Sequence, residues 1–149
     1  MSKMIAHVAA AAMLAAWSLA AGGAAAADAV GVWATEGGKS HVQIMPCEDK
    51  LCGTIIWLKE PLNDEGEPKH DANNPEEEMQ ARPILGLPLL TGFVPNGEAG
   101  VWDDGEIYNP EDGETYSCTL TLVDDDTLKV RGYVGLPLFG KTQIWTRVN

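Results

Sequence analysis

Positive charge is scarce in this sequence: 10 Lys and Arg residues stand against 22 Asp and Glu residues, which gives a formal net charge of −12 at pH 7. The phosphates of nucleic acids and the headgroups of anionic lipids repel a chain of this charge. The composition therefore argues against both as partners. The acidity also keeps a small protein soluble, and for most of these residues we expect no other role.

Residues with catalytic chemistry are equally scarce. After residue 27 the only serines are Ser40 and Ser117, and no Gly-x-Ser-x-Gly is present. Ser40 and His41 are neighbours on an expected strand, so their side chains point to opposite faces and form no nucleophile–base pair. The sequence also lacks His-Glu-x-x-His, a tetrahedral set of Cys and His, and a glycine-rich phosphate loop. We predict no catalytic residue, no metal and no cofactor. An unrecognised hydrolase ranks third among the functions considered, and a loose calcium site in the acidic turns at 103–114 stays open.

Residues 1–27 have the three parts of a cleavable secretory signal. A lysine lies near the start, Val8–Leu19 is an alanine-rich apolar stretch, and Ala25-Ala26-Ala27 is the small-residue pattern of a cut before Asp28. A membrane anchor is the alternative, but it requires about 20 strongly apolar residues, and this stretch is shorter. We expect a mature chain of residues 28–149, one domain, that is periplasmic or secreted and has no membrane span.

Two of the three cysteines, Cys47 and Cys52, flank a short polar segment between two alternating apolar runs. In an oxidising compartment this spacing favours a disulfide at a hairpin tip over two free thiols. The closed loop is short, so its entropic contribution to stability is about 2 kcal/mol. If the two cysteines lie opposite each other, counting back along the hairpin pairs Ile44 with Ile55 and Val42 with Trp57. Both pairs then lie on the face of the hairpin opposite to the disulfide.

Alternation of apolar and polar residues dominates most of the mature chain. In Glu114–Val123 it places Cys118 on the apolar face, so we predict a small core residue and not a nucleophile. About eight short strands are expected, separated by turns rich in Gly, Asp and Pro. Many short strands in one small domain indicate a sandwich or a closed barrel. The clearest strands are Val30–Thr35, His41–Cys47, Cys52–Leu58, Glu114–Val123, Thr127–Val134 and Lys141–Val148.

The alternation stops at Glu60–Gln80, where prolines, a glycine and many charges indicate a long connection. Within it, Asn74-Pro75 followed by three glutamates has the composition of a helix start. We expect one short helix there, ending before Pro83.

A short motif occurs twice, as Arg82-x-x-x-Gly86-Leu87-Pro88-Leu89 and as Arg131-x-x-x-Gly135-Leu136-Pro137-Leu138. Because proline cannot donate to a central ladder, both copies are expected at strand ends, edges or bulges. We predict that the copies lie near each other and shape the rim or inner floor of the fold. Each arginine is expected to meet a carboxylate, and an internal Asp or Glu is favoured over a ligand because acids are abundant.

Longer motifs follow one another along nearly the whole mature chain: Gly31-x-Trp33, Cys47–Cys52-Gly53, Asp71-x-Asn73-Asn74-Pro75, Arg82-Pro83, Gly86-Leu87, Ile107-Tyr108-x-Pro110-x-Asp112-Gly113, Leu128-x-Val130-Arg131-Gly132 and Trp145-Thr146-Arg147. In kind and order they resemble the exported bacterial proteins grouped as domain of unknown function 2147. The resemblance implies an all-β, antiparallel, up-and-down barrel of about eight strands, lipocalin-like, and no established activity. It also implies that Trp33 packs beneath a basic side chain from a late strand, which is Arg147, with Arg131 as the competing partner.

The two Arg-x-x-x-Gly-Leu-Pro-Leu copies contain more apolar residues than a strand with alternating apolar and polar positions would have. In a small barrel such segments, beside basic residues at a mouth, can hold an anionic amphiphile such as a fatty acid, or they can fill the core. Two functions stay open: an exported, non-catalytic barrel that binds a small apolar or amphiphilic ligand, and an envelope structural or protein-interaction module with a filled barrel that binds through Glu60–Gln80. A cavity above about 300 Å³ favours the first, and an exposed apolar patch the second. The candidate ligand-binding residues are Arg82, Leu87, Arg131, Tyr133, Leu136 and Phe139.

Overall fold

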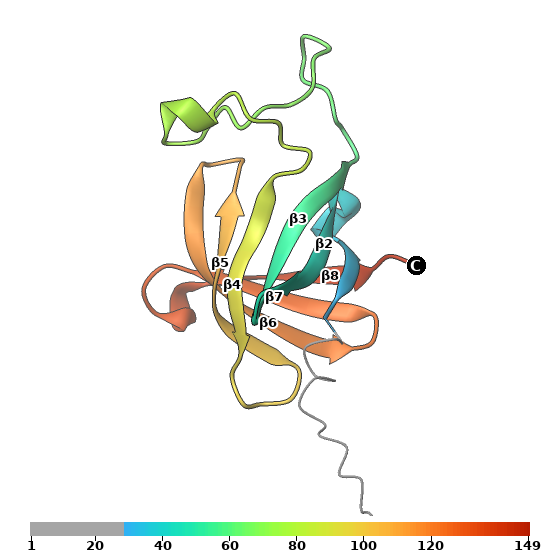
Figure 1. Cartoon of the computed structure of the whole chain (residues 1–149), viewed down its shortest axis with the longest axis vertical. Helices are drawn as coiled ribbons and strands as arrows, with labels where there is room; N and C mark the ends of the chain where they lie inside the picture. The colour runs from blue at the N-terminus through green and yellow to red at the C-terminus, as the bar shows by residue number, and fades with distance from the viewer. Residues whose placement is uncertain (1–28) are drawn as a thin grey trace, which may run out of the picture.

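The computed structural model describes residues 29–149, so the expected secretory signal at 1–27 lies outside the described residues. Eight antiparallel strands, each paired with the next along the chain, form a closed barrel (Figure 1). The last strand pairs with the first, which confirms a closed up-and-down barrel and excludes the sandwich. The strands are β1 (Gly31–Ala34), β2 (Ser40–Cys47), β3 (Lys50–Leu58), β4 (Pro88–Pro95), β5 (Val101–Asn109), β6 (Glu114–Asp124), β7 (Thr127–Tyr133) and β8 (Lys141–Arg147).

Helical structure in this part of the chain consists of single 3-10 turns, η2 (Glu36–Gly38), η3 (Glu77–Met79) and η4 (Pro137–Phe139). The expected short helix after Asn74 is thus the single turn η3. Its shortness has a local cause, because the Asn74 side chain accepts a 2.8 Å hydrogen bond from the Glu76 N–H and closes a turn there. Glu76 is then extended, so the helical turn begins only after it.

The barrel interior is filled with large side chains. Four aromatic residues are at most 1% exposed: Trp33, Phe93, Trp102 and Trp145. At Gly105 even a Cβ atom would overlap the ring of Phe93, so the two strands approach closely only because this residue is glycine. Cys118 is also buried, as its alternating strand predicted, and it is a free cysteine. The eight strands of the closed barrel and the apolar core described here lie within residues 29–149.

A disulfide joins Cys47 and Cys52, but the predicted hairpin register is wrong. Cys52 lies opposite Met45, because the chain turns tightly after Cys47 and pairs that residue with Lys50. A register shift next to Val42 then reverses the face of the following residues on β3, as bulges do.

Trp57 shows the effect of this shift. It is 42% exposed and stacks on His41 outside the barrel, with ring centroids 4.3 Å apart, and does not face Val42 in the core. The other three residues of the predicted pairs, Val42, Ile44 and Ile55, are buried.

The contact between Trp33 and Arg147 lies where the first and last strands close the barrel. The two residues are register partners, and the Arg147 guanidinium carbon lies 4.3 Å from the centre of the indole ring. The guanidinium also donates to the carbonyls of Asp125 (2.6 Å) and Val30 (3.1 Å). The indole N–H is satisfied by the carbonyl of Ala29 at 2.9 Å. Arg147, and not Arg131, is therefore the basic partner of Trp33.

Candidate functional site

The connection between β3 and β4, green in Figure 1, rises beyond one end of the barrel and then folds back on itself. Two isolated bridges brace it, Leu62 with Pro68 and His70 with Pro83. The backbone N–H of Asp71 donates to the carbonyl of Arg82 at 2.9 Å, so these two residues lie side by side. The connection is thus an ordered structure with a defined face toward the barrel.

Asp71 is fully buried and accepts hydrogen bonds from three side chains. Its Oδ1 accepts from the hydroxyl of Tyr108 at 2.6 Å. Its Oδ2 accepts from Arg82 Nε and from Asn74 Nδ2, both at 2.8 Å. The carboxylate therefore joins the connection to strand β5, which carries Tyr108.

The hydrogen bonds also set the protonation states of this cluster. Burial alone raises the pKa of Asp71, but the donors Tyr108, Asn74 and Arg82 reverse that effect and leave the pKa below its ordinary value of 3.8. The pKa of Tyr108 is raised above 10.0, first by burial and then by its hydrogen bond to the Asp71 carboxylate. At neutral pH the site accordingly contains a charged carboxylate and a neutral phenol.

The side chain of Asn73 also fastens the connection to the β5–β6 turn, through two hydrogen bonds. Its side-chain nitrogen donates to the carbonyls of Pro110 (3.1 Å) and Glu111 (3.0 Å). The carbonyl of Asn73 occupies the space that a Cβ atom at Gly113 would need. Gly113 also has φ 74°, which favours glycine, so only this residue type allows the two segments to meet.

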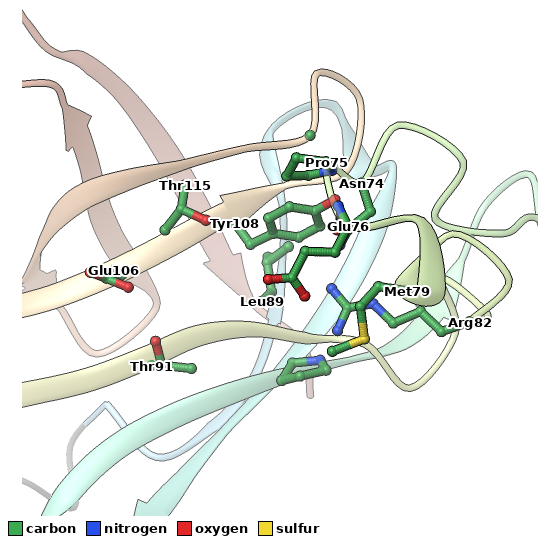
Figure 2. A pocket seen from close by; sticks show the side chains of 12 residues that line it. Asn74, Pro75, Glu76, Met79, Arg82, Leu89, Thr91, Glu106, Tyr108 and Thr115 are labelled. Atoms are coloured by element: carbon green, nitrogen blue, oxygen red, sulfur yellow. Dashed lines mark hydrogen bonds between the residues drawn. The ribbon is translucent and has the colours of Figure 1, made fainter.

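A cleft of about 260 Å³ lies between this connection and the barrel wall. The wall is the outer face of β4, β5 and β6, where Thr91 pairs with Glu106 and Tyr108 pairs with Thr115. The cleft is therefore outside the barrel, and Figure 2 shows these side chains directed into it from the strands. Its lining comprises Asn74, Pro75, Glu76, Met79, Arg82, Pro88, Leu89, Thr91, Glu106, Tyr108, Gly113 and Thr115.

Arg82 is the cation of the cleft. Its Nε is held by Asp71, its guanidinium lies 5.4 Å from the centre of the Tyr108 ring, and its side chain is 28% exposed. In the part of the chain that the structure describes, its side-chain hydrogen bonds go through Nε alone. Figure 2 shows the terminal nitrogens directed toward the carboxylate of Glu76, inside the cleft. A fixed guanidinium with two free NH₂ groups can bind an anionic oxygen pair.

The structure brings one of the six predicted ligand-binding residues, Arg82, to this cleft. Leu87 is 1% exposed and belongs to the apolar core. Tyr133 ends β7 and is half-buried. The side chains of Leu136 and Phe139 are 63% and 74% exposed, so they do not form an inner floor as predicted.

The second motif copy fails to reach the interior because β7 has already ended at Tyr133, and residues 134–139 are exposed in the loop that follows. The first copy instead leads directly into β4, beneath the long connection.

The two motif arginines also have different partners. Arg82 meets an internal carboxylate, Asp71, as expected. Arg131 donates to the carbonyl of Pro137, from Nε at 3.0 Å and from Nη2 at 2.7 Å, and to the hydroxyl of Thr142 at 2.8 Å. It therefore braces its own hairpin, and the prediction that it meets a carboxylate of the protein is wrong.

Sequence reasoning did not assign Asp71, Asn74 or Tyr108 to a site, although all three lie in the motifs that carry the family resemblance. Within residues 29–149 no group of three or more His, Cys, Asp and Glu side chains is arranged to hold a metal ion. In the same range, no helix has the length and apolar character needed to cross a membrane.

Comparisons with known proteins agree with this architecture. Residues 31–147 match the family described as an uncharacterized protein conserved in bacteria, domain of unknown function 2147. A search of curated proteins finds no match. Among solved structures, protein HP1028 from the human pathogen Helicobacter pylori, which is described as belonging to the lipocalin family, is similar with a TM-score of 0.69 and 23% identity, over 80% of this chain and 82% of that chain. At this identity the likeness concerns the fold.

Proposed function

Since the chain belongs to the bacterial family called domain of unknown function 2147 and has a lipocalin-like barrel, we propose that it is an exported, non-catalytic protein that binds a small amphiphilic ligand. The binding site is the cleft beside Arg82, outside the barrel. Export rests on the signal-like residues 1–27 and on the Cys47–Cys52 disulfide, a bond that persists in oxidising compartments such as the periplasm.

The observation that carries the proposal is the way Arg82 is held. A buried carboxylate fixes its Nε, and the ring of Tyr108 lies against the guanidinium, so its orientation is set before a ligand arrives. Such preorganisation reduces the entropy lost on binding. The terminal NH₂ groups form no hydrogen bond to the described residues but face the Glu76 carboxylate, so a carboxylate or another planar anion of the ligand takes the place of that internal carboxylate.

Size and charge define the ligand further. The barrel interior is filled with side chains, and the cleft outside it has about 260 Å³, less than the roughly 300 Å³ named above as favouring a ligand carrier. The proposal therefore concerns a ligand smaller than drug-sized molecules, bound outside the barrel, and a long-chain fatty acid does not fit. Asp71 neutralises Arg82, while Glu76 and Glu106 add negative charge to the lining. A molecule with both a carboxylate and an amine, of the size of an amino acid or a dipeptide, satisfies this arrangement, and Met79 and Leu89 supply apolar contact for its side chain.

The test is calorimetric titration of residues 28–149 with a panel of amino acids, dipeptides and short-chain carboxylates. We expect zwitterions to bind and Thr91→Trp, which fills the cleft from an exposed position on β4, to abolish the binding. Thr146→Trp, at an exposed position on β8, is the matched control and should bind normally. Arg82→Lys keeps the charge but loses the planar fork, so its affinity should fall about tenfold or more.

Two results would overturn the assignment. One is ligand binding that Thr91→Trp leaves intact, which places the site elsewhere. The other is the absence of binding to every member of the panel, together with no co-purifying small molecule in native mass spectra of the protein isolated from its host.

A further inference from the structure

Charge is divided unevenly between the last hairpin and the rest of the chain. None of the 22 Asp and Glu residues lies in residues 127–149, which include β7 and β8, whereas four of the 10 Lys and Arg residues do. The hairpin is thus a basic element of an acidic protein. Arg131 on β7 and Lys141 at the start of β8 place two of these charges beside the loop that joins the strands. An acidic side chain from elsewhere, Glu36, meets β8 further along, at the N–H of Ile144.

The β7–β8 loop, residues 134–140, is the most exposed apolar segment of the described chain. It carries no side chain that can form a hydrogen bond. Its four large apolar side chains are exposed: Val134 (67%), Leu136 (63%), Leu138 (79%) and Phe139 (74%). Single exposed apolar residues are common, but four in one loop indicate a surface made for contact. The loop, orange-red in Figure 1, stands out from the barrel wall.

Two backbone carbonyls at the tip of this loop are already hydrogen-bonded within the protein. The carbonyl of Leu136 accepts from the N–H of Phe139 at 3.1 Å, and the carbonyl of Pro137 accepts two donors from Arg131. Pro137 itself has no N–H. Because an unpaired backbone group costs free energy in an apolar medium, internal pairing lowers the cost of burying the tip.

We propose, independently of the cleft, that the β7–β8 loop inserts into the surface of an anionic lipid bilayer. The apolar side chains enter the boundary between headgroups and acyl chains, and Arg131 and Lys141 lie at the headgroup phosphates. A typical protein interface contains about 10 hydrogen bonds, and residues 134–140 supply no side chain for them, which favours a bilayer as the partner of this loop. The net charge of −12 opposes adsorption of the whole molecule to anionic lipids, as the composition predicted, so the contact is confined to the basic hairpin and the acidic remainder faces away from the membrane.

The test is co-sedimentation of residues 28–149 with vesicles of phosphatidylethanolamine and phosphatidylglycerol at low ionic strength. Replacing Leu138 and Phe139 together by Ser should lower the partition coefficient by about tenfold or more, while the melting temperature stays unchanged because both side chains are exposed. The matched control is Val123→Ser, which removes an apolar side chain that is 59% exposed near the end of β6 and should not alter partition. Lys141→Glu should weaken binding to these vesicles, and the difference from the wild type should become smaller at high salt, which screens the charge of the headgroups.

Several outcomes would refute the insertion. If wild-type protein does not sediment with the vesicles, or if the double variant and the Val123→Ser control behave alike, the loop does not insert. If the wild type is a dimer in solution and the double variant is a monomer, with no vesicle binding in either, the loop contacts a second copy of the chain instead.

Discussion

The hydroxyl of Tyr108 donates a 2.6 Å hydrogen bond to the buried carboxylate of Asp71, a residue 37 positions earlier in the chain. This bond joins the long connection to strand β5, and the candidate cleft lies between the two. Loss of this hydrogen bond should therefore loosen the contact between the connection and β5 that forms the cleft.

Tyr108→Phe removes the hydroxyl donor from a buried, charged acceptor. Hydrogen bonds to charged groups contribute about 1.5–3 kcal/mol, so we expect the free energy of unfolding to fall by about that amount in urea titrations. Tyr133→Phe is the control, since the Tyr133 hydroxyl has no hydrogen bond to a described residue. Equal losses in the two variants would show that the bond to Asp71 is not special.

The same carboxylate predicts a pH dependence. The pKa of Asp71 is lower in the folded chain than the ordinary 3.8, so its contribution to stability is present above that value and is lost as the pH falls through the folded pKa. We expect the free energy of unfolding to decrease below about pH 4, and the decrease to be smaller in Asp71→Asn. Asp64→Asn, at an exposed position, should keep the wild-type profile.

Arg147→Ala removes the cation over the Trp33 ring and two hydrogen bonds to carbonyls. The stacking is worth about 0.5–2 kcal/mol, so the melting temperature should fall while ligand binding in the distant cleft is unchanged. Lys129→Ala, on the exposed side of β7, should leave the melting temperature as it is. A loss of ligand affinity in Arg147→Ala would mean that the barrel closure and the cleft are coupled.

The three cysteines should differ in reactivity. Burial raises the pKa of the Cys118 thiol to about 12, so almost no thiolate forms at neutral pH. We expect iodoacetamide to label Cys118 only after denaturation, and non-reducing peptide mapping to find Cys47 joined to Cys52. Labelling of Cys118 in the native protein would show that the barrel opens at β6.

The secretory signal is tested on the exported protein. N-terminal sequencing should begin at or near Asp28, because the three preceding alanines form the expected cleavage pattern. An intact Met1 on protein in the membrane fraction would instead support the anchor.

Two kinds of feature were predictable from the sequence: the face of a residue within an alternating strand, and the contact between the first and last strands of a closed barrel. Cys118 is buried because alternation within one strand decides its face. Trp33 meets Arg147 because a closed barrel makes the first and last strands neighbours. The hairpin of Cys47 was harder, since a tight turn and a bulge shift the register without leaving a periodic signal.

The cleft could not be predicted in this way. Asp71 lies in a connection, and a contact between a connection and a distant strand has no sequence period. The repeated motif was misleading for a related reason: Leu87 and Leu136 occupy equivalent motif positions, but only the first has other segments of the chain packed over it. The burial of these two leucines depends on which other segments pack against them, and the sequence of the motif carries no information about those segments.

The pairing of β1 with β8 also means that the described chain begins and ends at one place. The N–H of Val148 donates to the carbonyl of Val32 at 2.8 Å, next to the barrel closure. A short linker from Asn149 to Ala29 would therefore span little space, and the chain could be opened instead at the exposed loop of residues 96–99. We expect such a circular permutant to form the same ring of eight strand pairs, which would show that the barrel does not depend on the order in which its strands are synthesised.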